Sequence, residues 1–324
     1  MPGPSNAVRC PVCSSGNLST LYPDTLGEDP PAFNYQFTPD HGRTYEILRC
    51  GDCTHAFSVP PRKDMWQNYE DVVDPAYLER SEERRLTFPQ VVKVLARYLP
   101  TGRLLDIGCA TGDFLEAASH NYQVEGLEPS QWSGDIARKR GFLIHSSRLG
   151  EFPSDPGYDI VTLWGVIEHF DSLKEDCSHI HRILKPGGLV AIWTGDRGSW
   201  LARLFGRKWW WIQGQHMQFF SRRSLLTLFS ELGFEPVYLT TYPFTTTFHL
   251  MTRSMGKYRI MGSLARIFLS CPVRSSMISS SGIENFSSLS AIPHPPVPTN
   301  TCSFWYHSSF CCVHIKDGLI PNTP

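Results

Sequence analysis

Four cysteines near the amino terminus are spaced for metal binding. They form two Cys-x-x-Cys pairs, Cys10 with Cys13 and Cys50 with Cys53, each with turn-forming residues inside or just after it. Two such pairs can present four thiolates to one tetrahedral ion, typically zinc. The 36 residues between the pairs exceed the usual spacing, so a disulfide pair and unrelated thiols are alternatives. Because a reducing cytosol disfavours disulfides, we predict a zinc-ribbon module over residues 1–60.

A second chemical signal is the segment RLLDIGCATGDFL, residues 103–115, in which a glycine turn follows an apolar run. Asp106 stands near the end of the run, and Gly108 and Gly112 let the backbone turn sharply and a ligand approach closely. A second apolar run ends in Glu128, 22 residues after Asp106. Strand, glycine turn and distant acid form the pattern of a nucleotide-type cofactor site, in which the acid lies beside the ribose hydroxyls.

The elements that must position these residues alternate between strand and helix. Strand patterns lie at residues 124–127, 142–145, 158–164, 189–194 and 236–240, and helix patterns at 113–119, 131–140, 171–184 and 222–232. Residues 62–99 have helical periodicity and lead into the first strand. Regular alternation predicts an α/β fold with a parallel sheet and helices on both faces, whose ligands bind at the carboxyl ends of the strands.

Composition and charge narrow the range of partners. The chain has 324 residues, 41% of them hydrophobic, with 30 basic and 31 acidic residues and a formal net charge of −1. This balance makes nucleic acid an unfavoured partner and gives no general attraction to an anionic membrane. No run approaches the roughly 18 apolar residues of a spanning helix, and no signal peptide is evident, so we expect a cytoplasmic enzyme.

The last part of the chain has a different character. Beyond residue 270 the formal charges are Arg274, Glu284, Lys316 and Asp317, amid serine, proline and cysteine. We expect residues 262–324 to form an atypical, poorly ordered tail, with a frame error or an unspliced intron as the sharper explanation. Residues 302–315 are an alternative source of a last strand.

Four ordered motifs, RLLDIGCATG, GLEPS, YDIVTLWGVIEHF and ILKPGGLVAIWT, resemble the class I S-adenosylmethionine-dependent methyltransferases. The resemblance implies a Rossmann-like methyltransferase sheet within residues 61–261, between the zinc module and the tail. The cysteine pairs and the stretch WWWIQGQHMQFFSRRSLLTLFSELGF resemble, more narrowly, bacterial-type enzymes that modify sugars, polysaccharides or secondary metabolites. A nicotinamide-dependent dehydrogenase is disfavoured because its G-x-G-x-x-G fingerprint is missing.

The same resemblance implies a set of cofactor-binding residues. The turn would surround the methionine part of S-adenosylmethionine, Glu128 would bind the ribose, residues 147–149 would lie near the adenine and Trp164 would line the pocket. Ala110 stands where many relatives have glycine, and the acid common near the adenine is missing. The full set is Asp106, Gly108, Cys109, Ala110, Gly112, Glu128, Pro129, Ser147, Arg148, Leu149 and Trp164.

The sequence indicates the residues that would bind the methyl acceptor less clearly than those that would bind the cofactor. An activated methyl mainly needs an aligned nucleophile and exclusion of water, and a base helps if the acceptor is a hydroxyl or an acidic carbon. We predict His169 and His216 as candidate bases, with bracing of the next helix as the alternative for Glu168 and His169. Trp, Phe, Arg and Lys residues between 198 and 220 suggest an acceptor wall, a membrane-surface element or simple packing.

The expected partner is therefore a small-molecule or glycan-linked acceptor. An RNA or protein acceptor, or a catalytically silent cofactor-binding scaffold, are the alternatives. The oligomeric state is not predicted.

Overall fold

The computed structural model describes residues 8–27, 42–59, 70–241, 244–247, 301–304 and 308–315. The chain divides into one unit of Met1–Pro243 with Trp305–Pro324 and a second unit of Phe244–Phe304. In the second unit, β11 (Phe244–Thr247) pairs antiparallel with β12 (Thr301–Phe304). The first unit carries the residues singled out above.

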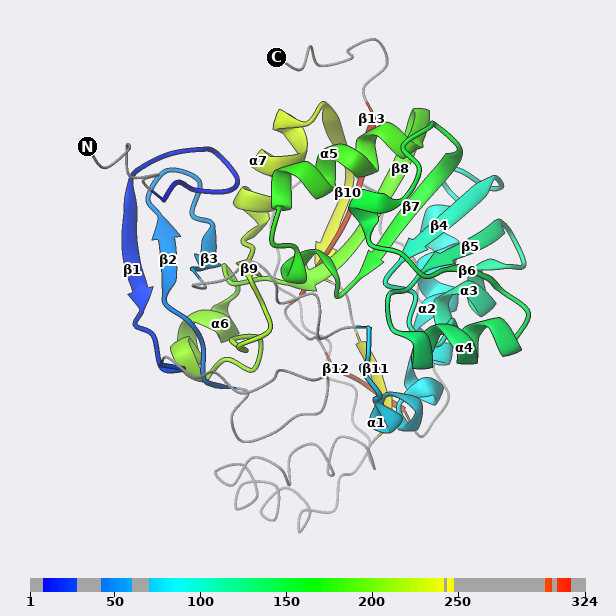
Figure 1. Ribbon diagram of the computed structural model, residues 1–324, viewed down its shortest axis with the longest axis horizontal. Coiled ribbons are helices and arrows are strands. Elements are labelled where there is room, and N and C mark those ends of the chain that lie inside the picture. The colour runs from blue at the N-terminus through cyan, green and yellow to red at the C-terminus, as the bar shows by residue number, and fades with distance from the viewer. Residues whose placement is uncertain are drawn as a thin grey trace, which may run out of the picture. The chain divides into compact units, whose positions relative to one another are not determined.

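A seven-stranded sheet lies at the centre of the first unit, in the order β10-β13-β8-β7-β4-β5-β6 (Figure 1). The strands from β8 to β6 pair in parallel, whereas β13 is antiparallel to both of its neighbours. This arrangement confirms the predicted Rossmann-like methyltransferase fold. The strands are β4 (Arg103–Ile107), β5 (Gln123–Leu127), β6 (Leu143–His145), β7 (Tyr158–Trp164), β8 (Leu184–Gly195), β10 (Phe234–Thr241) and β13 (Ser308–Ile315).

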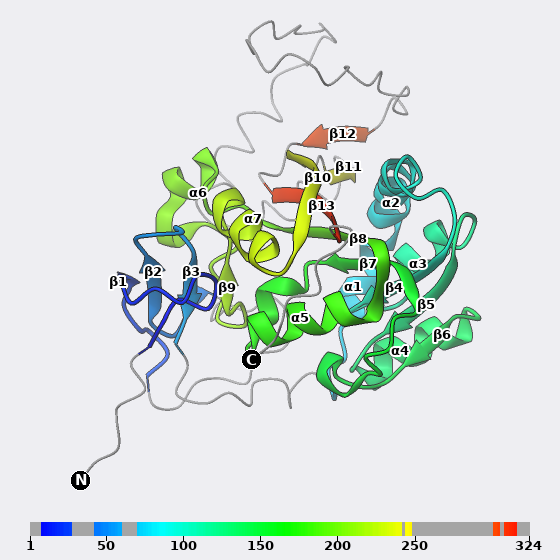
Figure 2. The same ribbon diagram turned by 90° about the horizontal axis from the view of Figure 1, so that it is seen from above.

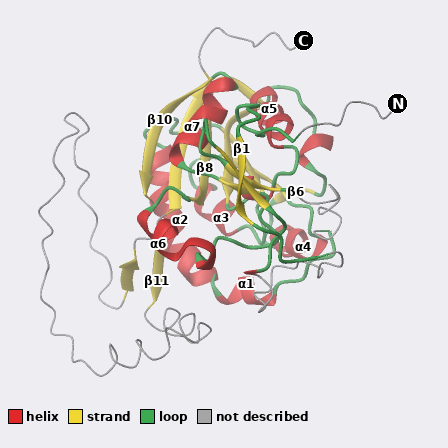
Figure 3. Ribbon diagram, turned by 90° about the vertical axis from the view of Figure 1, so that its left-hand side faces the viewer, coloured by secondary structure: helices red, strands yellow, loops and turns green. Residues whose placement is uncertain are grey.

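Helices cover both faces of this sheet because its strands are apolar on both sides. On one face, Leu105 and Ile107 pack in one core cluster with residues of α5 (Leu173–Ile183) and α7 (Arg222–Glu231). On the other face, Leu104 and Ile160 pack with α2 (Ser81–Leu95) and α3 (Asp113–Ala118). Figure 2 shows these two pairs of helices on opposite sides of the strands, and Figure 3 shows the same layers from another side. The remaining helices are α1 (Pro75–Glu79), α4 (Gln131–Lys139) and α6 (Trp200–Phe205).

Strand β13 comes from the part of the chain in which we expected poor order. Most of residues 262–324 lie outside the described residues, but Ser308–Ile315 depart from that expectation by filling the place between β8 and β10. Cys311, Cys312 and Val313 are fully buried there. The alternative that residues 302–315 supply a last strand therefore agrees with the sheet for residues 308–315. Other boundaries of the three predicted regions stay predictions.

The amino-terminal module forms a separate four-stranded antiparallel sheet in the order β1-β2-β3-β9. Its own strands are β1 (Leu18–Tyr22), β2 (Ile47–Cys50) and β3 (Ala56–Ser58). The fourth, β9 (Gln218–Phe219), follows β8 and α6 in the chain. The module is thus joined to the methyltransferase fold by strand pairing as well as by packing. No helix within the described ranges is long and apolar enough to cross a membrane.

Candidate cofactor and acceptor site

The glycine turn follows β4 and has three residues with positive φ. Gly108, Ala110 and Gly112 have φ values of +68°, +46° and +82°. The Gly108 N–H donates to the carbonyl oxygen of Leu127 at 2.7 Å, which ties the turn to the end of β5. A Cβ on Gly108 would lie 2.6 Å from Cγ2 of Val166, so the position accepts no side chain without movement. The turn is therefore a close-packed backbone cradle at the carboxyl end of β4.

Glu128 meets this turn because β4 and β5 are parallel and in register, with Ile107 opposite Leu127. Its Oε2 accepts the N–H of Ala110 at 2.8 Å, and its Oε1 accepts the N–H of Ser130 at 2.8 Å. Burial raises the pKa of Glu128 to about 7, although both backbone N–H groups favour the ionised form. The Glu128 carboxylate is thus held in place by the glycine turn with which it is predicted to bind the cofactor.

Asp106 lies on β4 immediately before the turn and is 1% exposed. Its Oδ1 accepts the hydroxyl hydrogen of Thr162 at 2.6 Å. Burial raises the pKa of Asp106 well above its ordinary value; the Thr162 hydroxyl opposes this rise and the charge of Glu128 adds to it. Two buried carboxyl groups with raised pKa values, one at the end of β4 and one just after β5, make this edge a candidate ligand site.

Tyr77 is a residue of this region that the sequence pattern missed. Its ring lies under the guanidinium of Arg84, with 3.6 Å from Cζ to the ring centroid. Burial raises the pKa of the Tyr77 phenol, Arg84 opposes the rise, and Asp106 and Glu128 are among the carboxylates that add to it. Arg84 also donates to the carboxylate of Asp113, the residue after Gly112, at 2.7 Å, so Tyr77 lies near the start of α3 and the glycine turn. A tyrosine within a helical pattern gives no local signal of such a role.

The residues at this edge of the sheet fit S-adenosylmethionine. The Glu128 carboxylate retains lone pairs after its two backbone bonds and can accept from both ribose hydroxyls. Thr111, inside the turn, is fully buried, and its hydroxyl has no hydrogen-bond partner among the described residues. Because Gly108 and Gly112 have no side chains, the turn leaves space beside its backbone for the methionine part of S-adenosylmethionine.

The other predicted cofactor residues occupy the neighbouring strand ends. The Glu128 N–H donates to the carbonyl oxygen of His145 at 3.0 Å, which places the end of β6, and Ser147 just after it, beside the end of β5. Leu149 is buried in the core cluster of α5, and Arg148 lies 3.9 Å from the Glu70 carboxylate. The structure thus brings this segment to the same edge.

Three further predicted residues are packed into the walls of the site. Cys109 is a buried thiol whose pKa is raised by burial, and Pro129, just after β5, is half-buried. Trp164, at the end of β7, packs against Phe114 with 4.8 Å between the ring centroids. Part of its role is therefore to fill the space between β7 and α3.

His169 and His216 lie side by side although 46 residues of chain separate them. Their ring centroids are 4.8 Å apart in an edge-to-face arrangement, and the residues are only 8% and 5% exposed. His169 ends the 3-10 helix η4 (Ile167–His169), which follows β7, and His216 lies just before β9. Burial lowers the pKa of His169 to about 4, only partly offset by a hydrogen bond to the carbonyl of Gln215. Its imidazole is therefore neutral near pH 7.

The four amino-terminal cysteines gather into one cluster of free thiols. The Sγ atoms are 3.5 Å apart for Cys10 and Cys53 and 3.6 Å apart for Cys13 and Cys50, and all four lie within 4.8 Å of one another. A tetrahedral zinc ion with bonds of about 2.3 Å needs sulfur atoms about 3.8 Å apart. Burial raises the pKa of Cys10 to about 11, a cost that a cation would remove.

The aromatic stretch between residues 198 and 220 divides into two parts. Trp209 and Phe219 are buried and pack with Ile47 and Ala56 of the amino-terminal sheet. Trp200 is 60% exposed, and it shares α6 with Leu204 and Phe205, which are also exposed. Packing therefore accounts for the buried part, while the exposed part stays available for an acceptor or a surface contact.

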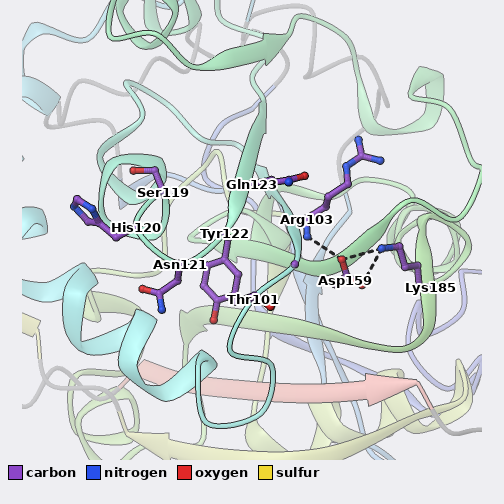
Figure 4. A pocket seen from close by; sticks show the side chains of 10 residues that line it. Thr101, Arg103, Ser119, His120, Asn121, Tyr122, Gln123, Asp159 and Lys185 are labelled. Carbon is purple, nitrogen blue, oxygen red and sulfur yellow. Dashed lines mark hydrogen bonds and ion pairs between the residues drawn. The ribbon is translucent and has the colours of Figure 1, made fainter.

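An open pocket lies at the opposite edge of the sheet, where β4 and β5 begin (Figure 4). At its rim Lys185 Nζ contacts both carboxylate oxygens of Asp159 at 2.9 Å, and the Arg103 N–H donates to Asp159 at 2.8 Å. Ligands of parallel α/β sheets bind at the carboxyl ends of the strands, so this pocket is remote from the cofactor residues.

Comparison with known proteins shows a similarity to methyltransferases over part of the chain. Residues 80–239 match the family model described as a methyltransferase domain. The probable tRNA methyltransferase 9B of Bos taurus is 29% identical over 137 residues, which are 40% of this chain and 30% of that protein. The demethylmenaquinone methyltransferase of Alkalihalophilus pseudofirmus is 28% identical over 175 residues, 44% of this chain and 74% of that protein. A crystal structure of a possible histamine N-methyltransferase from Thermotoga maritima aligns with a TM-score of 0.46 and 22% identity, over 74% of this chain and 95% of that one.

The matched family model spans the strands from β4 to β8 and the glycine turn between β4 and α3. The strand order, with one antiparallel strand inserted between β8 and β10, and the acid after β5 agree with that match. Residues 80–239, just under half of the chain, are therefore similar to the methyltransferase domain family.

Proposed function

We propose that this protein is a class I S-adenosylmethionine-dependent methyltransferase that transfers the methyl group to an oxygen, nitrogen or carbon nucleophile of a small or glycan-linked acceptor. The observation that supports this most directly is the meeting of two groups at the carboxyl ends of the strands. Glu128 is hydrogen-bonded to the glycine turn, and His169, which follows β7, lies against the buried His216. A donor site and a candidate proton acceptor are thus positioned by neighbouring strands.

In this proposal the cofactor supplies an electrophilic methyl group, and the chain binds and orients it. Glu128 accepts the two ribose hydroxyls, the turn from Gly108 to Gly112 holds the methionine part, and residues 147–149 lie beside the adenine. The bond between Asp106 and Thr162 ties the strand before the turn to β7. We propose that Tyr77, held by Arg84 near the start of α3, helps to exclude water from the site.

For an acceptor with a hydroxyl or an acidic carbon, His169 or His216 takes up the proton. Both rings are hydrogen-bonded through Nδ1 to backbone carbonyl oxygens, at 3.1 Å from Gln215 and 2.7 Å from Trp211. A carbonyl can only accept, so Nδ1 carries the hydrogen and the neutral ring has its lone pair on Nε2. The same bonds also support the alternative that the pair braces the surrounding loops.

Zinc bound by Cys10, Cys13, Cys50 and Cys53 forms the core of the amino-terminal ribbon in this proposal. The ribbon in turn holds the segment that carries His216. The Ser58 N–H donates to the Met217 carbonyl oxygen at 2.8 Å, and the Ser58 hydroxyl donates to the His216 carbonyl oxygen at 3.3 Å. We propose that the ribbon positions one wall of the acceptor site.

Calorimetric titration with S-adenosylmethionine tests the cofactor site. Glu128→Gln removes the ionised carboxylate while keeping its size, and we expect binding to weaken at least tenfold, about 1.4 kcal/mol. Asp159→Asn is the matched control, since it changes a carboxylate at the far edge of the sheet and should leave affinity unchanged. Equal affinities for the three proteins would contradict the assignment of Glu128.

The acceptor class is tested by incubating cell extract with the protein and cofactor labelled in the methyl group. A labelled product in the small-molecule or glycan fraction supports the proposal. Label in RNA would favour the activity named for the tRNA methyltransferase relative, and label in protein would favour a protein acceptor. Cofactor binding without any labelled product, together with a stable bound partner, would favour a silent scaffold.

A further inference from the structure

Glu168, His169 and His216 form a cluster of potential metal ligands that is separate from the four cysteines. One ligand atom from each lies within 4.8 Å of the others, and all three residues are buried. Glu168 and His169 belong to η4, whereas His216 precedes β9. The Met217 N–H donates to the backbone carbonyl oxygen of Glu168 at 2.7 Å, so the segment that carries His216 is fastened to η4.

Hydrogen bonds determine which imidazole nitrogen faces a metal. As described above, Nδ1 of His169 and Nδ1 of His216 each donate to a backbone carbonyl oxygen. With the hydrogen on Nδ1, the neutral form of each ring carries its lone pair on Nε2. Metal-binding histidines in proteins show this same arrangement, in which the second nitrogen is held by a carbonyl or carboxylate and fixes the tautomer and the ring orientation.

The carboxylate of Glu168 is also oriented by a hydrogen bond, as the two imidazoles are. The Thr194 hydroxyl donates to its Oε2 at 2.9 Å, which orients the group and leaves further lone pairs on both oxygens. Two imidazoles and one carboxylate form the donor set of zinc sites that keep a coordination position open. Imidazole nitrogen disfavours Mg²⁺ and Ca²⁺, which prefer oxygen ligands.

We propose that Glu168, His169 and His216 bind one divalent transition-metal ion, Zn²⁺ before others, through a carboxylate oxygen and two Nε2 atoms. Bonds of about 2.0 Å in a tetrahedral site place the ligand atoms about 3.3 Å apart, which is within the 4.8 Å over which one ligand atom of each residue gathers. Three protein ligands leave a fourth position for water or for an oxygen of the acceptor.

This inference goes beyond the methyl transfer proposed above, since metal binding needs neither cofactor nor acceptor. It also changes the part that the histidines play. One Nε2 lone pair cannot bind a metal and take up a proton at the same time, so in the metal-loaded protein the ion replaces the histidine as the group that activates an acceptor hydroxyl. A metal ion does so by lowering the pKa of the oxygen bound to it.

Metal analysis of the full-length protein tests the inference. After equilibration with Zn²⁺ and desalting, we expect the unmodified protein to hold one equivalent more than His169→Gln or His216→Gln. His179→Gln is the matched control, because His179 is also buried but lies outside the cluster. It should keep the full zinc content. Equal zinc content in the unmodified protein and in both cluster variants would overturn the inference.

Cobalt gives a second readout that distinguishes the two sites. Thiolate-bound Co²⁺ absorbs strongly in the near ultraviolet, whereas a site of two imidazoles and one carboxylate contributes only weaker visible bands. Glu168→Gln, which keeps the shape of the side chain, should remove the weaker bands and keep the thiolate absorption. Unchanged visible bands in Glu168→Gln would overturn the proposal. Calorimetry with S-adenosylmethionine on the same samples reports the cofactor site independently, so failure of the metal site and failure of the proposed function are distinguishable.

Discussion

Gly108 offers a direct test of how the cofactor turn is built. In Gly108→Ala the new methyl group would have to fit against Cγ2 of Val166, 2.6 Å from the ideal Cβ position, on a backbone with φ of +68°. An alanine at positive φ costs about 1–2 kcal/mol, and overpacking of a close contact costs about 1–3 kcal/mol more. We expect Gly108→Ala to lower the free energy of unfolding by roughly 2–5 kcal/mol.

Two further variants separate the backbone strain from the steric clash. Gly141 has φ of +93°, and an added Cβ there would meet nothing within 4 Å, so Gly141→Ala should cost only the strain of about 1–2 kcal/mol. In a Val166→Ala background the clash at Gly108 is removed. Gly108→Ala should then cost about as much as Gly141→Ala.

Urea unfolding of the unmodified protein, Gly108→Ala, Val166→Ala and the double variant measures this coupling. The dependence of the unfolding free energy on urea concentration is compared among the four proteins. The expected interaction energy between Gly108→Ala and Val166→Ala is about 1–3 kcal/mol in favour of the double variant. Additive effects, with a coupling below about 0.5 kcal/mol, would refute the packing of Val166 against the turn.

Three other predictions follow from the same edge of the sheet. Because burial raises the pKa of Glu128 to about 7 and ribose hydroxyls need the ionised form, affinity for S-adenosylmethionine should fall about tenfold per pH unit below that pH. Calorimetry should show this slope, and Glu128→Gln should abolish it. Asp113 is buried, which alone would raise its pKa, but Arg84 and Arg140 hold that pKa below its ordinary value. The contribution of ionised Asp113 to the free energy of unfolding is therefore fully present above the ordinary pKa of aspartate. It is lost as the pH falls through the lowered pKa. Asp113→Asn should lower the free energy of unfolding by about 3 kcal/mol near pH 7 in urea titrations, and a stability equal to that of the unmodified protein would contradict this. Ala110→Gly relieves a φ of +46° and should stabilise by about 1 kcal/mol; a lower melting temperature would count against strain at this residue.

The sequence predicts the parts of the fold whose signals are local. The predicted strand at residues 158–164 has the bounds of β7, and the strand, turn and helix at 103–119 appear as β4, the glycine turn and α3. Glu128 arrives beside the turn because parallel pairing in register follows from the βαβ connection itself. Short-range periodicity and turn chemistry are enough for these elements.

Features that depend on distant pairing were not predictable in the same way. Successive residues of β13, Cys311, Cys312 and Val313, are all fully buried, so both faces of the strand are covered and it lacks the polar and apolar alternation that would separate a strand from an atypical tail. Tyr77 reaches the cofactor residues only through the packing of α1 beside α2 and the position of Arg84. The proximity of His169 to His216 likewise depends on contacts formed far along the chain.

Strand pairing connects the amino-terminal module to the histidine pair. A strand as short as β9, with two residues, has no stability of its own, so its position is set by pairing with β3. The buried bond between His55 Nε2 and Gln218 Oε1, at 2.9 Å, adds to that pairing. Strand β3 follows directly after Cys53, and small modules of this size depend on their metal to fold. A zinc ion bound by the four cysteines would therefore stabilise β3, and through the pairing of β3 with β9 it would fix the position of His216 beside His169.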